Sequence, residues 1–171
     1  MIKFETDRLM LLPLQAQDLA LSVENYGDME AALGLIVTNT ILDDEMTYAM
    51  KVRLRKVLED NDNFLWLTNW AVVLKDENRI IGFIMIKGCP NENGEVIVGY
   101  AIEEKYQKRG YGTEALKGLV EWIFKNPKAI YVIADTEIDN IPSHKVLINA
   151  GAVKYKEDDE LIWWRIENKL S

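Results

Sequence analysis

One stretch of the chain combines glycines with basic residues in a pattern that suits phosphate binding. It lies between a predicted strand and a predicted helix, where the first helical turn offers unpaired N–H groups and a partial positive charge. Glycines let the backbone approach a phosphate closely, and two basic side chains add positive charge. The stretch is therefore predicted to bind a pyrophosphate. Its residues are Gln107, Lys108, Arg109, Gly110, Tyr111, Gly112 and Thr113.

The same stretch excludes two better-known nucleotide-binding motifs. It lacks the Gly-Lys-Ser/Thr ending of a Walker loop and the Gly-x-Gly-x-x-Gly spacing of a dinucleotide-binding fingerprint. Taken alone, it is equally compatible with a glycine loop that only turns the chain.

A second pair of polar residues, Asn140 and Ser143, opens a later predicted helix, with Pro142 in its first turn. An asparagine at this position is typical of a helix N-cap, and the spacing alone favours that structural role. His144, the only histidine, adjoins Ser143, but neighbours on a helix point apart and no third group is identifiable. We therefore expect no nucleophile–base pair at this place.

The remaining reactive residues suggest neither a covalent carrier nor a metal. Cys89 is the only cysteine, so no intramolecular disulfide forms. It lies in a predicted turn, where a chance loop cysteine is favoured over an acetyl carrier. No Cys, His or carboxylate cluster has the spacing of metal ligands, so no metal is expected.

The elements that position these residues alternate between strands and helices, which predicts an α/β domain. Helices are expected at Asp18–Tyr26, Asp43–Glu59, Gly112–Phe124 and Ile141–Ala150, with Asp18 as an N-cap. The segment Gly27–Leu42 fits either a loop or a short helix. Strands are expected at Arg8–Leu14, Leu65–Leu74, Arg79–Lys87, Glu95–Glu103, Ala129–Thr136, Ala152–Lys156 and Leu161–Glu167. The unit from Glu95 to Thr136 implies a parallel crossover inside a mixed sheet.

Length and charge narrow the class of protein. The 171 residues fit one domain, 1–171, and 20 basic against 28 acidic residues give a net charge of −8. This charge argues against a nucleic-acid surface and mildly favours cationic substrates. The N-terminus does not resemble a signal peptide and no apolar run could span a bilayer, so we expect a cytoplasmic protein without membrane contact. The tryptophans are expected in the core or at an interface, which leaves a homodimer open.

The glycine stretch and its surroundings resemble the GNAT superfamily of acetyltransferases. The core pattern Gln/Arg-x-x-Gly-x-Gly/Ala is met by Gln107, Gly110 and Gly112. A wider similarity, which includes the Asn-x-x-Ser pair, points to the branch with ribosomal-protein N-terminal acetyltransferases, the Rim-like branch. The similar segments are Glu5–Leu9, Trp70–Gly82, Val98–Ile102 and Tyr106–Ala115.

The resemblance implies an acetyl-CoA-dependent N-acetyltransferase with the GNAT fold. That fold has a mixed, mostly antiparallel twisted sheet of about seven strands, a splayed central parallel pair and about four helices. The loop amides would bind the acetyl-CoA pyrophosphate, and the pantetheine arm would enter the wedge between the splayed strands. The Ile102 N–H would polarise the thioester carbonyl. The implied cofactor-binding residues are Tyr100, Ala101, Ile102, Gln107, Lys108, Arg109, Gly110, Tyr111, Gly112, Thr113, Asn140 and Ser143.

The resemblance also assigns the chemistry near the sulfur. Asn140 would contact the pantetheine region, and Ser143 would hydrogen-bond or protonate the departing sulfur. Many other members use a tyrosine one turn further along the helix as the acid, and Leu147 stands there in this chain. In the Rim-like branch a Glu often stands where this chain has Ile97. Glu95, on the same strand face, is an alternative base acting through a water, although an edge carboxylate without a catalytic role is equally favoured.

The acceptor is expected to be a primary amine, and we favour the α-amine of a peptide or protein. An α-amine has a pKa of roughly 7.7–8.0 against about 10.4 for lysine, so it needs less help from a base at neutral pH. Two alternatives stay open: a small-molecule acetyltransferase for polyamines or aminoglycosides, and a non-catalytic acyl-CoA-binding regulatory domain.

Overall fold

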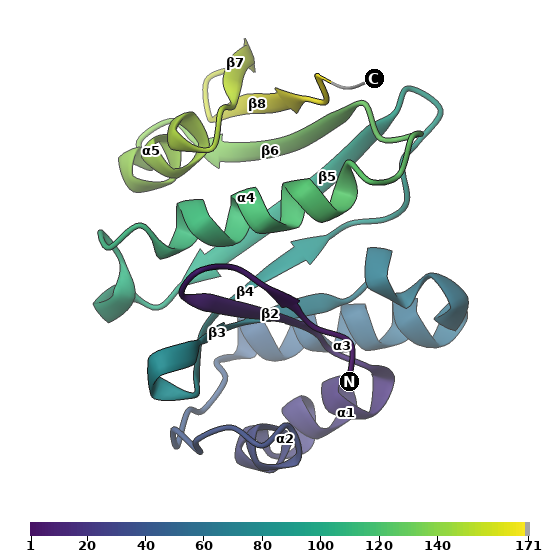
Figure 1. Ribbon diagram of the computed structural model, residues 1–171, viewed down its shortest axis with the longest axis vertical. Helices are drawn as coiled ribbons and strands as arrows, with labels where there is room; N and C mark the ends of the chain where they lie inside the picture. The colour runs from purple at the N-terminus through teal and green to yellow at the C-terminus, as the bar shows by residue number, and fades with distance from the viewer. Residues whose placement is uncertain (170–171) are drawn as a thin grey trace.

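The computed structural model describes residues 1–169 and arranges them around one eight-stranded sheet (Figure 1). The strand order is β1-β2-β3-β4-β5-β6-β8-β7, and every neighbouring pair is antiparallel except β5 and β6. The expected mixed sheet with a central parallel pair is therefore confirmed. The strands are β1 Phe4–Glu5, β2 Leu9–Pro13, β3 Asn69–Leu74, β4 Arg79–Ile86, β5 Glu95–Ile102, β6 Tyr131–Glu137, β7 Val153–Glu157 and β8 Leu161–Glu167.

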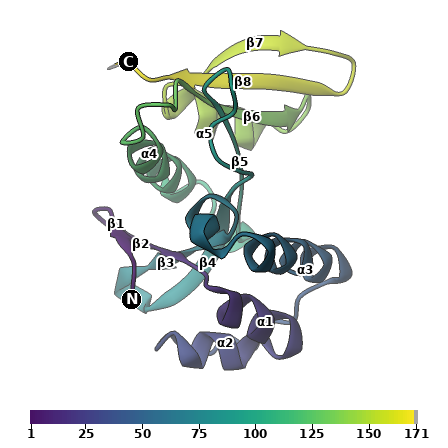
Figure 2. The ribbon, with the colours of Figure 1, turned by 90° about the vertical axis from the view of Figure 1, so that its right-hand side faces the viewer.

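Helices cover both faces of this sheet. Helices α4 and α5 pack on one face, and α1, α2 and α3 pack on the other over the N-terminal strands (Figures 1 and 2). The helices are α1 Ala16–Glu24, α2 Tyr26–Ala32, α3 Asp44–Glu59, α4 Tyr111–Ile123 and α5 Ile141–Asn149. Three short 3-10 turns are η1 Asn61–Trp66, η2 Lys75–Glu77 and η3 Glu104–Tyr106.

Strand β3 explains why the protein has two hydrophobic cores. All six of its residues are buried, and their side chains alternate between the two faces of the sheet. Trp70 and Val72 belong to the core beneath α4, whereas Ala71 and Val73 belong to the core beneath α1 and α3. A strand covered on both faces reads as a continuous apolar run, as this one does in the sequence.

The structure corrects several details of the sequence-based prediction. It has an eighth strand, β1, whose two residues are too few to show alternation, and a fifth helix, α2, at the start of the ambiguous segment. Asp18 is not an N-cap: Gln15 precedes α1, and the Asp18 carboxylate accepts the Gln15 N–H at 2.9 Å from the third helical position. The N-cap of α3 is Asp43, whose carboxylate accepts the Met46 N–H at 2.7 Å.

Candidate active site

The parallel strands β5 and β6 separate along their length. They pair only where Glu95–Ile97 lies beside Tyr131–Ile133. Beyond these residues β5 pairs with β4 up to Ile102, and β6 pairs with β8 up to Glu137. A wedge therefore opens between the two strands towards their C-terminal ends, as the expected splayed pair requires.

At the open end, the backbone of β5 directs polar groups into this wedge. The Glu103 N–H donates to the Ile81 carbonyl on the β4 side at 2.8 Å. Because backbone groups of successive strand residues point to opposite edges, the N–H and C=O of Ile102 and Tyr100 face the edge that β6 has left. Gln107 Nε2 donates to the Ile102 carbonyl at 2.9 Å, which ties the loop to the end of the strand.

The loop after β5 presents unpaired amides. Lys108 and Gly110 have positive φ angles of 65° and 84°, and α4 begins at Tyr111 without a side-chain cap. Within residues 1–169, none of the amides of Lys108–Thr113 donates to a backbone carbonyl. Free amides at the start of a 13-residue helix form an anion-binding arrangement, because the helix dipole places partial positive charge at the same point.

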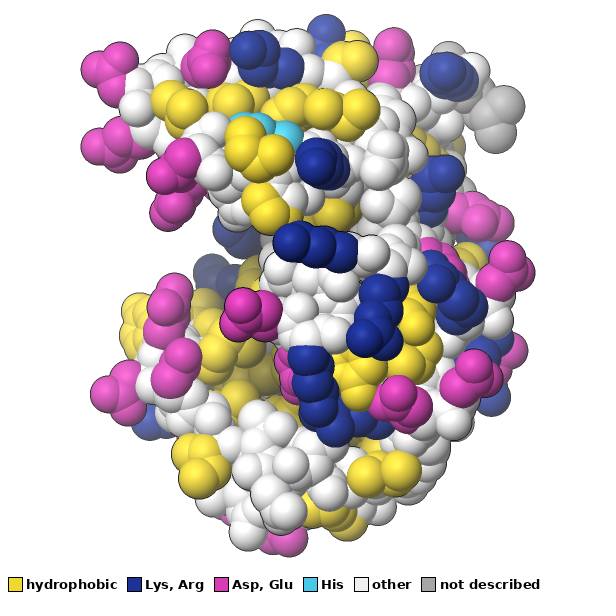
Figure 3. Space-filling model, turned by 90° about the vertical axis from the view of Figure 1, so that its left-hand side faces the viewer, with side chains coloured by type: hydrophobic (Ala, Val, Ile, Leu, Met, Phe, Trp, Pro, Cys, Tyr) yellow, Lys and Arg dark blue, Asp and Glu magenta, His cyan; other side chains and the backbone are white. Residues whose placement is uncertain are grey.

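A cleft of about 840 Å³ lies where the wedge, the loop and the start of α5 meet. All the predicted cofactor residues line it except Arg109, whose guanidinium lies 5.9 Å from the Tyr106 ring centroid. Lys145 also lines the cleft and was not predicted. On this side of the molecule, Lys and Arg side chains gather below the single histidine (Figure 3), against the acidic balance of the whole chain.

The start of α5 brings Asn140 and Ser143 to the cleft. Asn140 is the N-cap, since its Oδ1 accepts the Ser143 N–H at 3.3 Å, so the structural role expected from the spacing is present. The Tyr100 hydroxyl donates to the Ser143 carbonyl at 3.2 Å. Burial raises the pKa of Tyr100 to about 12, so this hydroxyl stays protonated at neutral pH. The sequence predicts a role in cofactor binding for the backbone of Tyr100 but not for its side chain.

The other two residues of α5 that the sequence singles out, His144 and Leu147, do not line the cleft. Leu147 is buried in the core, so this position supplies no acid. His144 Nε2 lies 3.0 Å from the Glu137 carbonyl, and its ring centroid lies 5.4 Å from that of Trp164. These contacts give His144 partners other than the Ser143 hydroxyl.

The structure does not bring Glu95 to the cleft. Glu95 lies opposite Tyr131 at the closed end of the wedge, five residues and about 16 Å along the strand from Tyr100. It lines a separate pocket of about 150 Å³ together with Arg165, whose guanidinium lies 4.9 Å from the Tyr131 ring centroid. Asn91 Nδ2 donates to the Glu95 carboxylate at 3.1 Å.

The remaining candidates can be placed briefly. Cys89 is exposed in the turn between β4 and β5, outside the cleft, and partial desolvation raises the pKa of its thiol. Among residues 1–169, no cluster of three or more His, Cys, Asp or Glu side chains has the arrangement of a metal site. None of the helices in this part of the chain has the length and apolar character needed to cross a bilayer.

Comparison with known sequences supports one family. The model of the acetyltransferase (GNAT) domain matches residues 8–153. Two relatives from Bacillus subtilis (strain 168) are named uncharacterized N-acetyltransferases. YjdG is 29% identical over 110 residues, which cover 64% of this chain and 66% of YjdG. YnaD is 34% identical over 82 residues, which cover 48% of each chain. The chain thus matches less than two thirds of either relative's length.

Solved structures share the fold. The ribosomal-protein-S5-alanine acetyltransferase of Vibrio fischeri has a TM-score of 0.73 at 21% identity, over 99% of this chain and 98% of that one. The ribosomal L7/L12 α-N-protein acetyltransferase RimL, in complex with coenzyme A, has a TM-score of 0.69 at 10% identity, over 97% and 98%. The family model spans most of the chain and the fold agrees with it, so this protein belongs to the GNAT family of N-acetyltransferases.

Proposed function

We propose that this N-acetyltransferase moves the acetyl group of acetyl-CoA directly to the α-amine of a peptide or protein. One observation carries the proposal: the unpaired amides of Lys108–Thr113 lie at the mouth of the wedge between β5 and β6. Such amides bind a pyrophosphate well, and the wedge leaves strand backbone free to pair with an amide-containing arm. RimL, which has the same fold, is described in complex with coenzyme A, and this supports the choice of cosubstrate.

In this proposal the pyrophosphate, the pantetheine arm and the sulfur of acetyl-CoA each have a partner in the cleft. The loop amides bind the pyrophosphate, and Lys108 and Lys145 add positive charge beside it. The pantetheine arm lies along β5 and pairs with the open-edge backbone groups of Tyr100, which leaves the Ile102 N–H for the thioester carbonyl. Asn140 and Ser143, on the opposite wall, lie beside the sulfur. The cleft volume is in the range that small-molecule and cofactor sites usually have.

The acetyl group then transfers by direct attack. The amine nitrogen bonds to the thioester carbonyl carbon, and the Ile102 N–H stabilises the oxyanion that forms. As this intermediate collapses, the C–S bond breaks and the nitrogen loses its extra proton to solvent. The departing sulfur takes a proton from the Ser143 hydroxyl, which solvent then replenishes. Cys89 lies outside the cleft, so the proposal includes no acetyl-cysteine intermediate.

The α-amine is favoured over a lysine side chain for two reasons. In the part of the chain that the structure describes, no Asp, Glu or His lines the cleft. An α-amine, with a pKa of roughly 7.7–8.0, is about one tenth neutral at pH 7 and about half neutral at pH 8, whereas lysine, with a pKa of about 10.4, is almost fully protonated there and needs a base. The names of the Vibrio fischeri neighbour and of RimL describe acetylation of a ribosomal-protein alanine and of a protein α-amine, which supports the same acceptor class here.

The test is a competition at pH 7 between two peptide sets. One set has a free N-terminus and no lysine; the other has a blocked N-terminus and one lysine. We expect acetylation, detected by mass spectrometry together with thiol release, on the free N-terminus. Preferential acetylation of the blocked lysine peptides would refute the α-amine proposal.

A small cationic amine is the second candidate, because the net charge of −8 would attract one. Spermidine and an aminoglycoside are therefore included in the same assay. Turnover of these amines with neither peptide set acetylated would assign the protein to small-molecule acetylation and would leave the acetyl-CoA part of the proposal intact.

A further inference from the structure

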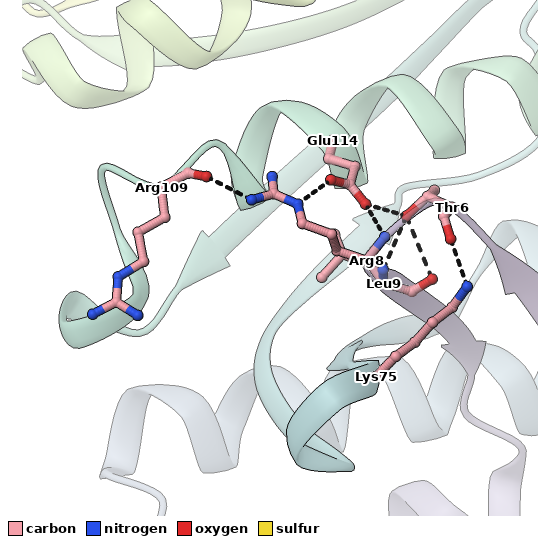
Figure 4. A network of polar contacts seen from close by, with 6 residues as sticks. All are labelled: Thr6, Arg8, Leu9, Lys75, Arg109 and Glu114. Carbon is pink, nitrogen blue, oxygen red and sulfur yellow. Dashed lines mark hydrogen bonds and ion pairs between the residues drawn. The ribbon is translucent and has the colours of Figure 1, made fainter.

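The N-terminal segment holds the first turn of α4 through a single carboxylate, that of Glu114 (Figure 4). Three donors from Thr6 and Arg8 converge on it. Thr6 Oγ1 and the Arg8 backbone N–H donate to Glu114 Oε2 at 2.6 and 2.8 Å, and Arg8 Nε donates to Oε1 at 2.7 Å. Because both carboxylate oxygens are engaged, the orientation of Glu114 depends on the N-terminal segment.

Arg8 also contacts the loop that precedes this helix. Its Nη1 donates to the Arg109 carbonyl at 3.0 Å, and its guanidinium lies 4.4 Å from the Tyr111 ring centroid. A trans peptide points its C=O and N–H in opposite directions. By holding the Arg109 carbonyl, Arg8 therefore sets the direction of the Gly110 N–H, one of the unpaired amides, and points it away from itself.

The ion pair between Arg8 and Glu114 affects anion binding because of where the Glu114 carboxylate lies. Its carboxylate lies one turn inside the helix whose N-terminus faces the cleft, so an unpaired negative charge there would oppose a bound pyrophosphate. Partial burial works against ionisation of Glu114, but the hydrogen bonds from Thr6 and Arg8 outweigh it and keep its pKa below the usual value. The Arg8 side chain is 45% exposed, and such a pair contributes little to the free energy of unfolding.

We propose that Arg8 is a positioning residue for acetyl-CoA, which orients the Arg109–Gly110 peptide and neutralises Glu114 so that the loop amides can accept the pyrophosphate. The inference rests on the proposed function and adds a residue 101 positions away from the loop to its binding determinants. Arg8 acts on the loop rather than on the reacting atoms.

The experiment compares two acetyl donors in Arg8→Ala and in a matched control. Acetyl-CoA carries the pyrophosphate, whereas S-acetyl-pantetheine lacks it. We expect Arg8→Ala to lower kcat/KM for acetyl-CoA about tenfold, mainly through KM, and to change kcat/KM for acetyl-pantetheine less than about twofold. Lys75→Ala is the control: Lys75 Nζ donates to the Thr6 carbonyl at 2.6 Å and anchors the same segment, but it does not touch the loop. We expect this control to match wild type with both donors.

A second variant tests the effect of the Glu114 charge directly. It also distinguishes this effect from a loss of folding in Arg8→Ala. In Arg8→Ala/Glu114→Gln the unpaired carboxylate is gone, so calorimetry should show CoA bound about threefold more tightly than by Arg8→Ala alone. Equal losses with both donors, or weaker CoA binding in the double variant, would show a merely structural role and overturn the inference. Unchanged CoA binding in Arg8→Ala would overturn the inference about Arg8 and leave the proposed function standing. Failure of the wild-type protein to bind CoA would overturn both.

Discussion

Strand β5 changes partner along its length, and its two ends differ in what they offer a ligand. Over Glu95–Ile97 it pairs with β6, and charged side chains, Glu95 and Arg165, line a small pocket beside it. Over Val98–Ile102 it pairs with β4 only, and its free edge meets a loop of unpaired amides. The closed end thus resembles an ordinary sheet surface, whereas the open end exposes strand backbone that no neighbouring strand of the described chain pairs with, and only the Ile102 carbonyl there accepts a side-chain donor, Gln107 Nε2.

The two ends of β5 differ in whether a side chain or the backbone would supply the chemistry. At the closed end the chemistry would come from the Glu95 side chain, which lies about 16 Å along the strand from Tyr100. At the open end the chemistry would come from strand and loop backbone that no other described strand pairs with, with Ser143 and Tyr100 beside it. We propose that catalysis takes place at the open end, and substitutions at the two ends should therefore differ in their effect on turnover.

The largest effect is expected at the open edge of β5. Ile102→Pro removes the N–H that faces the wedge but leaves the β4 ladder intact, because that N–H does not point towards β4. Loss of one oxyanion donor should lower kcat by about 100-fold in a steady-state assay of thiol release. Ile102→Val keeps the N–H and serves as the control, with nearly wild-type turnover. A folded Ile102→Pro enzyme with an unchanged kcat would show that this amide does not stabilise the transition state.

A smaller effect on kcat is expected at Ser143, the proposed proton donor to the departing sulfur. Ser143→Ala should lower kcat about tenfold and leave the CoA dissociation constant unchanged, because the hydroxyl serves the departing thiolate. Cys89→Ser should have no effect in the same assay. If Ser143→Ala turns over like wild type, the proton must come from another source, and the Tyr100 hydroxyl and solvent are the candidates to examine next.

The smallest effect is expected at the closed end. Glu95→Gln should change kcat/KM for a peptide α-amine by less than about twofold. In both proteins kcat/KM should rise with pH up to the acceptor's own pKa, about 8, and level off above it. The sign follows from the acceptor, since only the neutral amine attacks and its fraction grows as pH increases. A tenfold loss in Glu95→Gln, or a shifted profile, would make Glu95 the base.

The sequence predicted features encoded locally far better than those that depend on distant contacts. The glycine loop runs directly into α4 and the cap at Asn140 runs directly into α5, so local spacing and propensity predict both. For Glu95 the sequence leaves a base and an edge carboxylate equally favoured, because strand alternation gives the face of a residue but not its distance from the site. The contact of Arg8 with the loop joins segments 101 residues apart and had no local signal. No local pattern indicates the role of the Tyr100 side chain, because its partner, the Ser143 carbonyl, lies 43 residues away.

The most direct test of the central claim is a calorimetric titration of CoA into wild type, Gly112→Ala and Gly112→Asp. A Cβ at Gly112 would lie 3.3 Å from Val146 Cγ2, a close contact that both variants share. The difference in CoA affinity between the two variants therefore reports the effect of the added carboxylate rather than that of the Cβ. We expect the alanine variant to bind within a few-fold of wild type and the folded aspartate variant to bind at least about 100-fold more weakly, because its carboxylate faces the pyrophosphate. Nearly wild-type affinity in folded Gly112→Asp would contradict the assignment of this loop as the acetyl-CoA site.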